Sequence, residues 1–575
     1  MSVSPESNII GSPASSRAAQ APRELWWLLP AACAVLLAVA WFSALGARAL
    51  ISPDEGRYAS ISLGMLQSGD WITPRLNGLL YFEKPALQYW LGALAFKLLG
   101  VSEFSARLWP ALAGFLTVLA VGFTAGRLWG RDTGLRALAI CASMFWVLGN
   151  SVYLTLDAGL AFWLTLSLCA VLLAREPATS ARASRHWVLL AWAAMALAVL
   201  TKGLVGLLIP GGTLAIVSLW QRDPSWWRGM HWRAGVLLFL AIAAPWFVVV
   251  SMRNPAFAEF FFIHEHFARF LTTAHHREGA WWYYVPLLLA GALPWTGALA
   301  LLPFGSSAAG AHGESALPAS PLRSQQCALL AWAGFVFLFF SASGSKLPSY
   351  ILPMFPALAL LVAERLRAIR TGVMRGVLLV PIVVWCLALL VSTQVSHFSS
   401  PNSPVSAIEP MAHAVRAGAG VFLVGAAAAW LFLRHDRRTA AVLSLALCQV
   451  FALVLVFRSH DSFGQLKSGA GPARALASYL DARTPVFAVR SYDQTLPFYL
   501  RRDIVLVDYA DEFELGQQLE PGKSIARVED FVAQWAREPK AAAYMRPDTW
   551  QALVAQNVPM RVVFRDPRRV MVVKP

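Results

Sequence analysis

Acidic residues stand at the ends of apolar segments in two places along the chain. Asp54 and Glu55 follow the first apolar segment, directly after Ser52 and Pro53, a pattern typical of a cap and first turn of a helix. Asp157 begins another apolar segment. An acid at the end of an apolar helix is costly unless it is paired or lines a wet cavity, so these carboxylates favour a functional site. The alternatives are a helix start stabilised by its dipole and simple solvation.

Carboxylate and imidazole side chains that could share a metal ion also lie in two segments. Glu83 precedes an apolar segment, and His264, Glu265 and His266 lie close together in another part of the chain. Carboxylate oxygen and imidazole nitrogen are ligands that suit zinc. The chain has neither a CxxC nor an HExxH motif, so an ordinary salt bridge would explain these residues equally well. We take Glu83 and His264 as candidate ligands of a divalent ion such as zinc, and expect that no cofactor is required.

The elements that must hold these residues are apolar. Of 575 residues, 57% are hydrophobic and 14% are charged, which is far more apolar than a soluble domain. Apolar runs of about 20 residues, enough for a helix to cross roughly 30 Å of hydrocarbon, recur from Leu25 to Phe457. We predict an α-helical polytopic membrane protein with a C-terminal soluble α/β domain. The expected parts are a cytoplasmic tail (1–24), a transmembrane domain (25–457) with outer loops 48–105 and 253–280, and a periplasmic α/β domain (458–575).

One apolar segment decides the orientation. Segment 86–99 would be about 21 Å long as a helix and carries Gln88 and Lys97, so it is too short to cross. If it lies at the interface, the arginine-rich loops share the cytoplasmic side with the N-terminus, as the positive-inside rule expects. About thirteen spans then place the soluble tail outside, together with Asp54, Asp157 and Lys202. The other apolar segments are 25–47, 106–128, 134–152, 158–174, 186–201, 203–220, 232–252, 281–303, 326–342, 350–364, 374–394, 417–433 and 439–457.

Composition and topology also exclude several classes of function. The formal net charge of +16 could indicate nucleic acid binding, but the arginines lie in short loops between apolar segments, where topology explains them. All six cysteines lie within apolar segments, so no disulfide framework is expected. A transporter would place ionisable residues near mid-span, whereas these acids lie at span ends. We expect a monomer among membrane lipids; a transporter or flippase, and a scaffold acting through the tail, are the alternatives.

A set of motifs carries a resemblance to a known family. The first outer loop contains PDEGRY, GDWITPRLNG and YFEKPALQYW. Further motifs are LTLDAGLAFW from Leu154, LTKGLVGLLIP from Leu200, FFFIHEHFARF from Phe260 and SGSKLPSYILP from Ser343. As a set, across the whole membrane part, they resemble the type C glycosyltransferases related to protein O-mannosyltransferases. Among these, the bacterial lipid A 4-amino-4-deoxy-L-arabinose transferases are the most similar.

The resemblance implies a sugar donor carried on undecaprenyl phosphate, and roles for particular residues. The acidic pair that marks this family falls on Asp54 and Glu55, and a second acid falls on Asp157. With Lys202 beside the membrane, these are the catalytic candidates. The leaving phosphate gains negative charge, which nearby cations stabilise; alternatively, such cations snorkel to lipid head groups. The candidates for binding the donor phosphate are Lys84, Arg269, Tyr350, Tyr81 and Lys346.

The acceptor decides the role of Asp54. The resemblance implies transfer of aminoarabinose to a lipid A phosphate at the periplasmic face of the bacterial inner membrane, which would lower the negative charge of the outer membrane and give polymyxin resistance. A phosphate oxygen is already anionic and needs no strong base, so Asp54 would orient the acceptor or stabilise positive charge on the sugar. If the acceptor is a hydroxyl, as in O-mannosyl transfer to protein or glycan, Asp54 would be the base. Either reaction is expected to be a single displacement with inversion.

Overall fold

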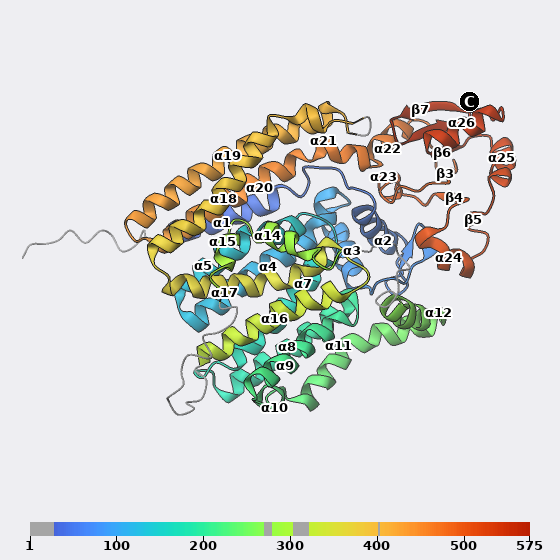
Figure 1. Cartoon of the computed structure of the whole chain (residues 1–575). Coiled ribbons are helices and arrows are strands. Elements are labelled where there is room, and N and C mark those ends of the chain that lie inside the picture. The colour runs from blue at the N-terminus through green and yellow to red at the C-terminus, as the bar shows by residue number, and fades with distance from the viewer. Residues whose placement is uncertain (1–27, 269–278, 303–320, 401–402) are drawn as a thin grey trace, which may run out of the picture.

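A long helical bundle and a domain built around a sheet lie end to end (Figure 1). This computed structural model describes residues 28–268, 279–302, 321–400 and 403–575. The bundle contains α1 (Leu28–Ser43), α4 (Glu103–Trp129), α5 (Arg131–Ser143), α6 (Phe145–Ser151), α7 (Asp157–Ala174), α8 (Ala181–Lys202), α9 (Val205–Gln221), α10 (Ser225–Arg228), α11 (Trp232–Arg253), α14 (Tyr284–Gly291), α15 (Thr296–Leu299), α16 (Pro321–Ala342), α17 (Phe355–Ala368), α18 (Thr371–Ser392), α19 (Val405–Arg434) and α20 (Arg438–Ser459).

The apolar segments form membrane-length helices, as expected of a polytopic protein. In the part of the chain that the structure describes, nine helices are long and apolar enough to cross a membrane, and α1 and α9 are shorter apolar helices. The predicted fold class, with its C-terminal α/β domain, is confirmed, whereas the expected count of about thirteen spans is not.

Two of the predicted spans are broken, which accounts for part of that difference. Segment 134–152 divides into α5 and α6 because Met144 between them has an extended backbone. Segment 281–303 divides into α14 and α15 around Pro294, which has no N–H to donate within a helix. The two breaks lie against each other, since the Phe145 N–H donates to the Leu293 carbonyl at 3.0 Å. Each break thus satisfies a backbone group that the other leaves unpaired.

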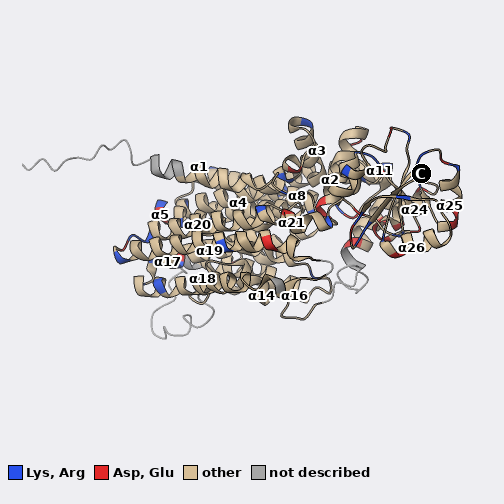
Figure 2. Cartoon of the chain, turned by 90° about the horizontal axis from the view of Figure 1, so that it is seen from above, with Lys and Arg blue, Asp and Glu red and all other residues tan. Residues whose placement is uncertain are grey.

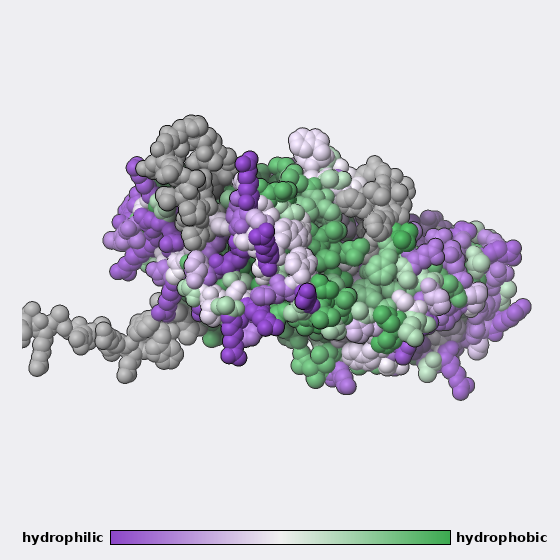
Figure 3. Space-filling model, turned by 90° about the horizontal axis from the view of Figure 1, so that it is seen from below, coloured by the Kyte–Doolittle hydropathy of each residue, from purple (hydrophilic) through white to green (hydrophobic). Residues whose placement is uncertain are grey.

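The surface of the molecule is divided into bands along its length. On the face seen in Figure 3, an apolar band crosses the middle of the molecule between two hydrophilic ends. Many of the lysines and arginines of the bundle gather around α5 and α17, at the end away from the sheet domain (Figure 2). This pattern is the one that the positive-inside rule gives to a membrane protein.

The first outer loop folds into a small layer between the bundle and the sheet domain. It contains α2 (Asp54–Ser68), a hairpin of β1 (Arg75–Leu76) and β2 (Leu79–Leu80), and α3 (Leu87–Leu99). With 13 residues, α3 is about 20 Å long, too short to cross the roughly 30 Å of a hydrocarbon core. Around the same end of the bundle lie α12 (Ala256–Ala258), the π-helix Glu259–Ala268 and the 3₁₀ helix Pro348–Met354.

The soluble domain is a six-stranded mixed sheet with helices. Its strand order is β5-β4-β3-β6-β8-β7, parallel from β5 to β6 and antiparallel beyond. The strands are β3 (Val486–Val489), β4 (Val505–Val507), β5 (Ser524–Ile525), β6 (Ala542–Met545), β7 (Arg561–Arg565) and β8 (Val570–Val573). The helices are α21 (Asp461–Gly464), α22 (Ala470–Leu476), α23 (Leu496–Leu500), α24 (Glu514–Leu519), α25 (Val528–Arg537) and α26 (Pro547–Ala555), with short 3₁₀ turns at Gln465–Lys467 and Asp511–Phe513. A further 3₁₀ turn, Val395–Phe398, lies between α18 and α19 of the bundle.

The two faces of this sheet have different partners, because successive strand residues point to opposite sides. Phe487 and Val489 of β3 pack with Trp535 of α25 in a core that belongs to the domain itself. Val486 and Ala488 belong instead to an apolar cluster that includes residues of the first outer loop. The sheet therefore holds the outer loop in place over the bundle.

Candidate active site

The first turn of α2 points its two acids in different directions. Ser52 does not cap this helix as expected: the cap position is Pro53, without a side-chain hydrogen bond, and Ser52 Oγ donates instead to Gln494 Oε1 at 2.5 Å. Neighbouring helix residues are about 100° apart around the axis. Asp54 consequently lines a cavity, while Glu55 is fully buried in the protein interior.

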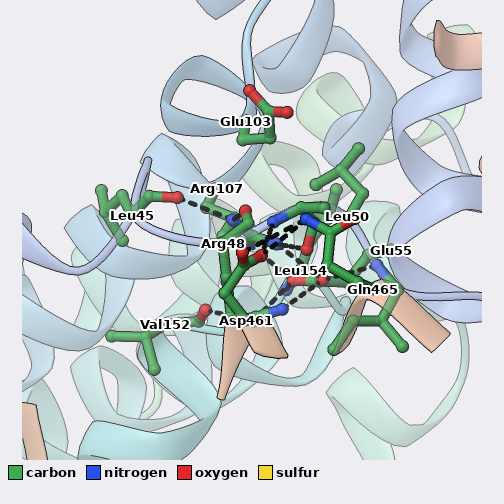
Figure 4. Close-up of polar contacts among 12 residues, drawn as sticks. Leu45, Arg48, Leu50, Glu55, Glu103, Arg107, Val152, Leu154, Asp461 and Gln465 are labelled. Atoms are coloured by element: carbon green, nitrogen blue, oxygen red, sulfur yellow. Dashed lines mark hydrogen bonds and ion pairs between the residues drawn. The ribbon is translucent and has the colours of Figure 1, made fainter. Parts of the chain in front are cut away.

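Glu55 is held between two arginines (Figure 4). Arg48 donates to its two oxygens at 2.7 and 2.9 Å, and Arg107 donates to them at 2.7 and 2.8 Å. The backbone N–H groups of Ile51 and Leu154 also donate to this carboxylate, both at 3.0 Å. Burial acts to raise the pKa of Glu55, but the charges of Arg107 and Arg48 and their hydrogen bonds outweigh it and lower the pKa from 4.5 to about 2. Glu55 is therefore ionised.

The same arginines also bind backbone carbonyls of the two segments that lead to Asp54 and to Asp157. Arg48 donates to the Val152 carbonyl at 2.9 Å, five residues before Asp157. Together with the bond from Leu154, this contact ties the segment leading to Asp157 to the segment leading to Asp54. Arg107 donates to three carbonyls of the connection between α1 and α2, those of Leu45, Arg48 and Ala49, at 2.7 to 2.9 Å.

Glu55 thus has a different place from the one that a catalytic role requires. Its side chain is 0% exposed, both of its oxygens accept hydrogen bonds, and it is not among the residues that line the cavity. The structure thus places Glu55 away from the cavity, where its charge holds together the elements that carry Asp54 and Asp157.

Asp157, Lys202 and Tyr350 come from three different elements and lie close together. Asp157 is the first residue of α7, Lys202 is the last of α8, and Tyr350 lies in the 3₁₀ helix Pro348–Met354. Lys202 Nζ donates to Asp157 Oδ1, and Ser349 Oγ donates to Asp157 Oδ2 at 2.7 Å. The Lys202 ammonium lies 4.5 Å from the centre of the Tyr350 ring. The structure brings together three residues that the sequence separates by almost 200 positions.

Lys84 lines the same cavity as Asp54. Its ammonium group donates to Glu265 Oε2 at 2.9 Å and to the Glu83 carbonyl at 2.7 Å. His264 Nδ1 lies 3.8 Å from Glu265 Oε1. Because Lys84 is paired, an anionic ligand would compete with Glu265 for it.

These groups surround one cavity of about 1140 Å³ at the junction of the bundle and the soluble domain. It is as large as the largest sites that usually bind small molecules in proteins. Its wall combines carboxylates and cations with the aromatic residues Phe145, Trp146 and Tyr153. Of the predicted site residues, it brings together Asp54, Glu83, Lys84, Asp157, Lys202, His264 and Tyr350. The soluble domain contributes Gln494, Asp511, Glu512, Glu514, Leu515 and Gln518.

The remaining predicted residues lie elsewhere. Tyr81 is 3% exposed and does not line the cavity; burial, with a smaller contribution from Glu83, raises its pKa, so its hydroxyl stays protonated. Lys346 is also absent from the lining and donates to the Ser343 carbonyl at 2.8 Å. Arg269 lies outside the described residues.

Sequence reasoning missed Arg57, Arg107 and Glu512. Arg57 could have been found, because it follows Asp54 by three residues and so lies on the same side of a helix. Arg107 carried only the signal of a charge within an apolar segment. Glu512 gave no signal, since it reaches the cavity from a domain without any recognisable motif.

The two side chains expected to bind zinc lie at the same cavity. Glu83 and His264 both line the cavity, but within the described ranges no group of three or more His, Cys, Asp and Glu side chains is placed to hold a metal ion. Zinc sites usually have three or four protein ligands. The ammonium group of Lys84 also lies 3.9 Å from the Glu83 carboxylate, where it would repel a cation.

Two family models match different parts of this chain. Residues 26–261 match the family described as dolichyl-phosphate-mannose-protein mannosyltransferase. Residues 472–574 match the family described as aminoarabinose transferase C-terminal domain. The first match covers the N-terminal part of the bundle, up to α12, with the first outer loop, and the second covers most of the sheet domain.

Individual relatives extend over most of the chain. An undecaprenyl phosphate-alpha-4-amino-4-deoxy-L-arabinose arabinosyl transferase of Pseudomonas paraeruginosa is 34% identical over 81% of this chain and 82% of its own length. The protein with the same description in Edwardsiella ictaluri is 37% identical over 57% of this chain and 58% of its own length. The crystal structure of ArnT from Cupriavidus metallidurans bound to undecaprenyl phosphate is 35% identical, with a TM-score of 0.88 over 96% of this chain and 98% of that one. The apo structure of the same enzyme has a TM-score of 0.88 over 95% and 97% of the two chains.

These similarities, together with the membrane bundle and the cavity beneath the sheet domain, exclude the transporter and scaffold alternatives. The chain belongs to the family of the undecaprenyl phosphate-aminoarabinose arabinosyl transferases, and it is a polytopic membrane glycosyltransferase of type C.

Proposed function

We propose that this protein transfers 4-amino-4-deoxy-L-arabinose from undecaprenyl phosphate to a phosphate group of lipid A. The relatives that span most of the chain are described as transferases of this sugar, and the similar crystal structure holds undecaprenyl phosphate. The observation that carries the proposal is the cavity itself, whose wall contains the cations of Lys84 and Lys202 together with the carboxylates of Asp54 and Asp157.

The donor end of the reaction follows from these charges. When the bond between the sugar and the phosphate breaks, negative charge grows on the phosphate oxygens and positive charge grows on the sugar ring. Lys84 stabilises the phosphate after it has displaced Glu265, and Lys202 with Tyr350 is the second group suited to this role. Arg269, Tyr81 and Lys346 stay candidates for the same phosphate.

The chemistry of the acceptor determines the role that we propose for Asp54. A lipid A phosphate oxygen is anionic near neutral pH and attacks without a general base. Asp54 then orients the acceptor or stabilises positive charge on the sugar, and Asp157 does the same from the other wall. Attack from the side opposite the leaving phosphate gives a single displacement with inversion. Transfer of another sugar to a hydroxyl of protein or glycan, with Asp54 as base, is the second candidate, favoured by the match to the protein mannosyltransferase model.

We also propose that the reaction takes place on the periplasmic face of the bacterial inner membrane. The basic residues gathered at the other end of the bundle support a cytoplasmic location for that end (Figure 2). The cavity and the soluble domain then lie in the periplasm, and the protein acts there as a monomer among membrane lipids. The added amine would lower the negative charge of the outer membrane and so give resistance to polymyxin.

The proposal requires no cofactor, because Lys84 and Lys202 supply cations within the cavity wall. We expect purified protein that has been dialysed against a chelator to keep its rate of sugar transfer to within about twofold. Inductively coupled plasma mass spectrometry would establish the metal content of the same sample. A lost rate that zinc alone restores would instead make Glu83 and His264 metal ligands.

Mass spectrometry of lipid A tests the function directly. Cells that lack the protein should lose the lipid A species that carries aminoarabinose, and a plasmid encoding the wild-type chain should restore it. A plasmid encoding Asp54→Asn, present in the membrane at the same level, is the control for transfer activity. An unchanged aminoarabinose content of lipid A in the deletion strain would refute the proposal. Loss of a sugar from protein or glycan in that strain would instead favour the second candidate, transfer to a hydroxyl group.

A further inference from the structure

Arg57 lies in the cavity wall between a carboxylate of the bundle side and one of the soluble domain. It follows Asp54 by almost one helical turn, and its Nη1 donates to Asp54 Oδ1 at 3.1 Å. Its Nε forms an ion pair with Glu512 of the soluble domain. The Arg57 and Glu512 side chains are only 13% and 5% exposed, whereas that of Asp54 is 39% exposed. Arg57 thus joins the more accessible of these two carboxylates, Asp54, to the more buried one, Glu512.

The soluble domain is held tightly at this point. Gln494 Nε2 donates to Glu512 Oε1 at 2.8 Å, and Ser52 and Ser60 donate to Gln494 at 2.5 and 3.1 Å. A Cβ atom at Gly56 would lie 2.4 Å from the peptide bond between Gln494 and Thr495, so α2 tolerates no side chain there. The turn around Gln494 therefore rests directly on the helical turn that carries Asp54.

Another ion pair between the same two parts of the chain shows what is particular to Arg57. Arg75, in the hairpin of the outer loop, binds Glu520 of the soluble domain at 2.8 Å. Neither of these residues lines the cavity. Of these two bridges between the outer loop and the soluble domain, the one through Arg57 therefore also contacts a proposed catalytic carboxylate.

From this arrangement we infer that Arg57 is a positioning residue for Asp54, and that the soluble domain sets its position through Glu512. The inference rests on the proposed function, because it assigns Asp54 to sugar transfer. With both carboxylates present, the guanidinium is shared and Asp54 keeps a definite orientation. Without Glu512, the guanidinium moves fully to Asp54 and neutralises the charge that the sugar or acceptor needs. The soluble domain is thus a functional part of the active site.

Steady-state kinetics of full-length Glu512→Gln in lipid nanodiscs test this inference. The donor is undecaprenyl phosphate-aminoarabinose and the acceptor is lipid A. We expect kcat to fall on the order of 10- to 100-fold, while KM for the donor stays within about twofold because Lys84 and Lys202 are unchanged. Arg57→Lys should show the same division between kcat and KM, because an ammonium group cannot bridge two carboxylates as a guanidinium does. Glu512→Asp should recover part of the rate.

Glu520→Gln is the matched control, since it removes an ion pair between the same two parts outside the cavity. It should leave kcat within about twofold of wild type. An equal loss of kcat in Glu520→Gln and Glu512→Gln would mean that Glu512 only helps to attach the soluble domain to the outer loop. That result would overturn the inference. A raised donor KM with unchanged kcat in Glu512→Gln would overturn it too, because Arg57 would then act in donor binding.

Hydrogen exchange separates this inference from the proposed function. Amide exchange in the first two turns of α2 should be faster in Glu512→Gln than in wild type, and unchanged in Glu520→Gln. This comparison needs no substrate, so it decides whether Glu512 holds the Asp54 turn even if wild-type protein transfers no aminoarabinose. Unchanged exchange in Glu512→Gln would refute the inference, whereas absence of transfer by wild type would refute only the proposed function.

Discussion

Replacing Asp54 with asparagine is expected to lower kcat for sugar transfer by roughly 10²- to 10⁴-fold, the usual range for removing a catalytic carboxylate. Asparagine has the same shape but no negative charge, so it can neither stabilise positive charge on the sugar nor accept a proton. Stability should change little, because the Asp54 side chain is 39% exposed and Arg57 keeps its ion pair with Glu512. A radiolabelled-donor assay together with thermal unfolding monitored by tryptophan fluorescence would measure both quantities.

Asp511→Asn is the matched control for this change. Asp511 lines the same cavity from the soluble domain and accepts a hydrogen bond from Tyr509 at 3.1 Å. Its replacement removes the same charge from the same wall, yet we expect it to leave kcat within about threefold of wild type. Equal losses in the two variants would mean that Asp54 acts only through the overall charge of the cavity. Wild-type activity in Asp54→Asn would remove it from the catalytic residues.

Replacing Glu55 with glutamine should, unlike Asp54→Asn, cause a large loss of stability. The variant leaves Arg48 and Arg107 buried without a counter-charge, which typically costs about 3–5 kcal/mol of unfolding free energy. Chemical unfolding in detergent, followed by tryptophan fluorescence, would measure this loss. The Glu103→Gln variant serves as control, since Glu103 accepts a hydrogen bond from Tyr499 at 3.1 Å and should lose less than about 1 kcal/mol.

The pH dependence of stability gives a second measurement of Glu55. Its pKa is about 2 in the folded protein against an ordinary value of 4.5, so the ionised form stabilises the fold above roughly pH 4.5. This contribution, about 3 kcal/mol, is lost as the pH falls from 4.5 towards 2. The difference in unfolding temperature between wild type and Glu55→Gln should therefore narrow between pH 6 and pH 3. A difference that stays constant over this range would contradict the assigned charge of Glu55.

The part of the site that depends on membrane topology could be predicted from the sequence. Hydrophobic length and arginine bias placed Asp54, Asp157 and Lys202 at one end of the bundle, and the structure brings Lys202 and Asp157 into contact. Treating segment 86–99 as too short to cross was decisive, and α3 has 13 residues. Such features follow from the thickness of the bilayer and need no knowledge of side-chain packing.

The roles of individual side chains could not be predicted in the same way. Asp54 and Glu55 are adjacent, and only the packing of α2 against Arg107 decides which of them faces the cavity. The prediction of one span over 281–303 was wrong because a hydropathy pattern does not show that Pro294 interrupts the helix. The Leu293 carbonyl at this interruption accepts a hydrogen bond from the Phe145 N–H. Glu512 reaches the site by a tertiary contact across more than 450 residues, for which no local pattern exists.

The two-sided sheet has a consequence for how this chain can vary. Val486 and Ala488 pack in the cluster shared with the outer loop, while Phe487 and Val489 between them pack within the domain. Substitutions at the first pair must be matched by compensating changes some 400 residues earlier in the chain, whereas those at the second pair can be compensated locally. The sheet domain and the membrane part must therefore change together during evolution. If the sheet domain were exchanged between distant relatives, its face carrying Val486 and Ala488 would no longer fit the outer loop.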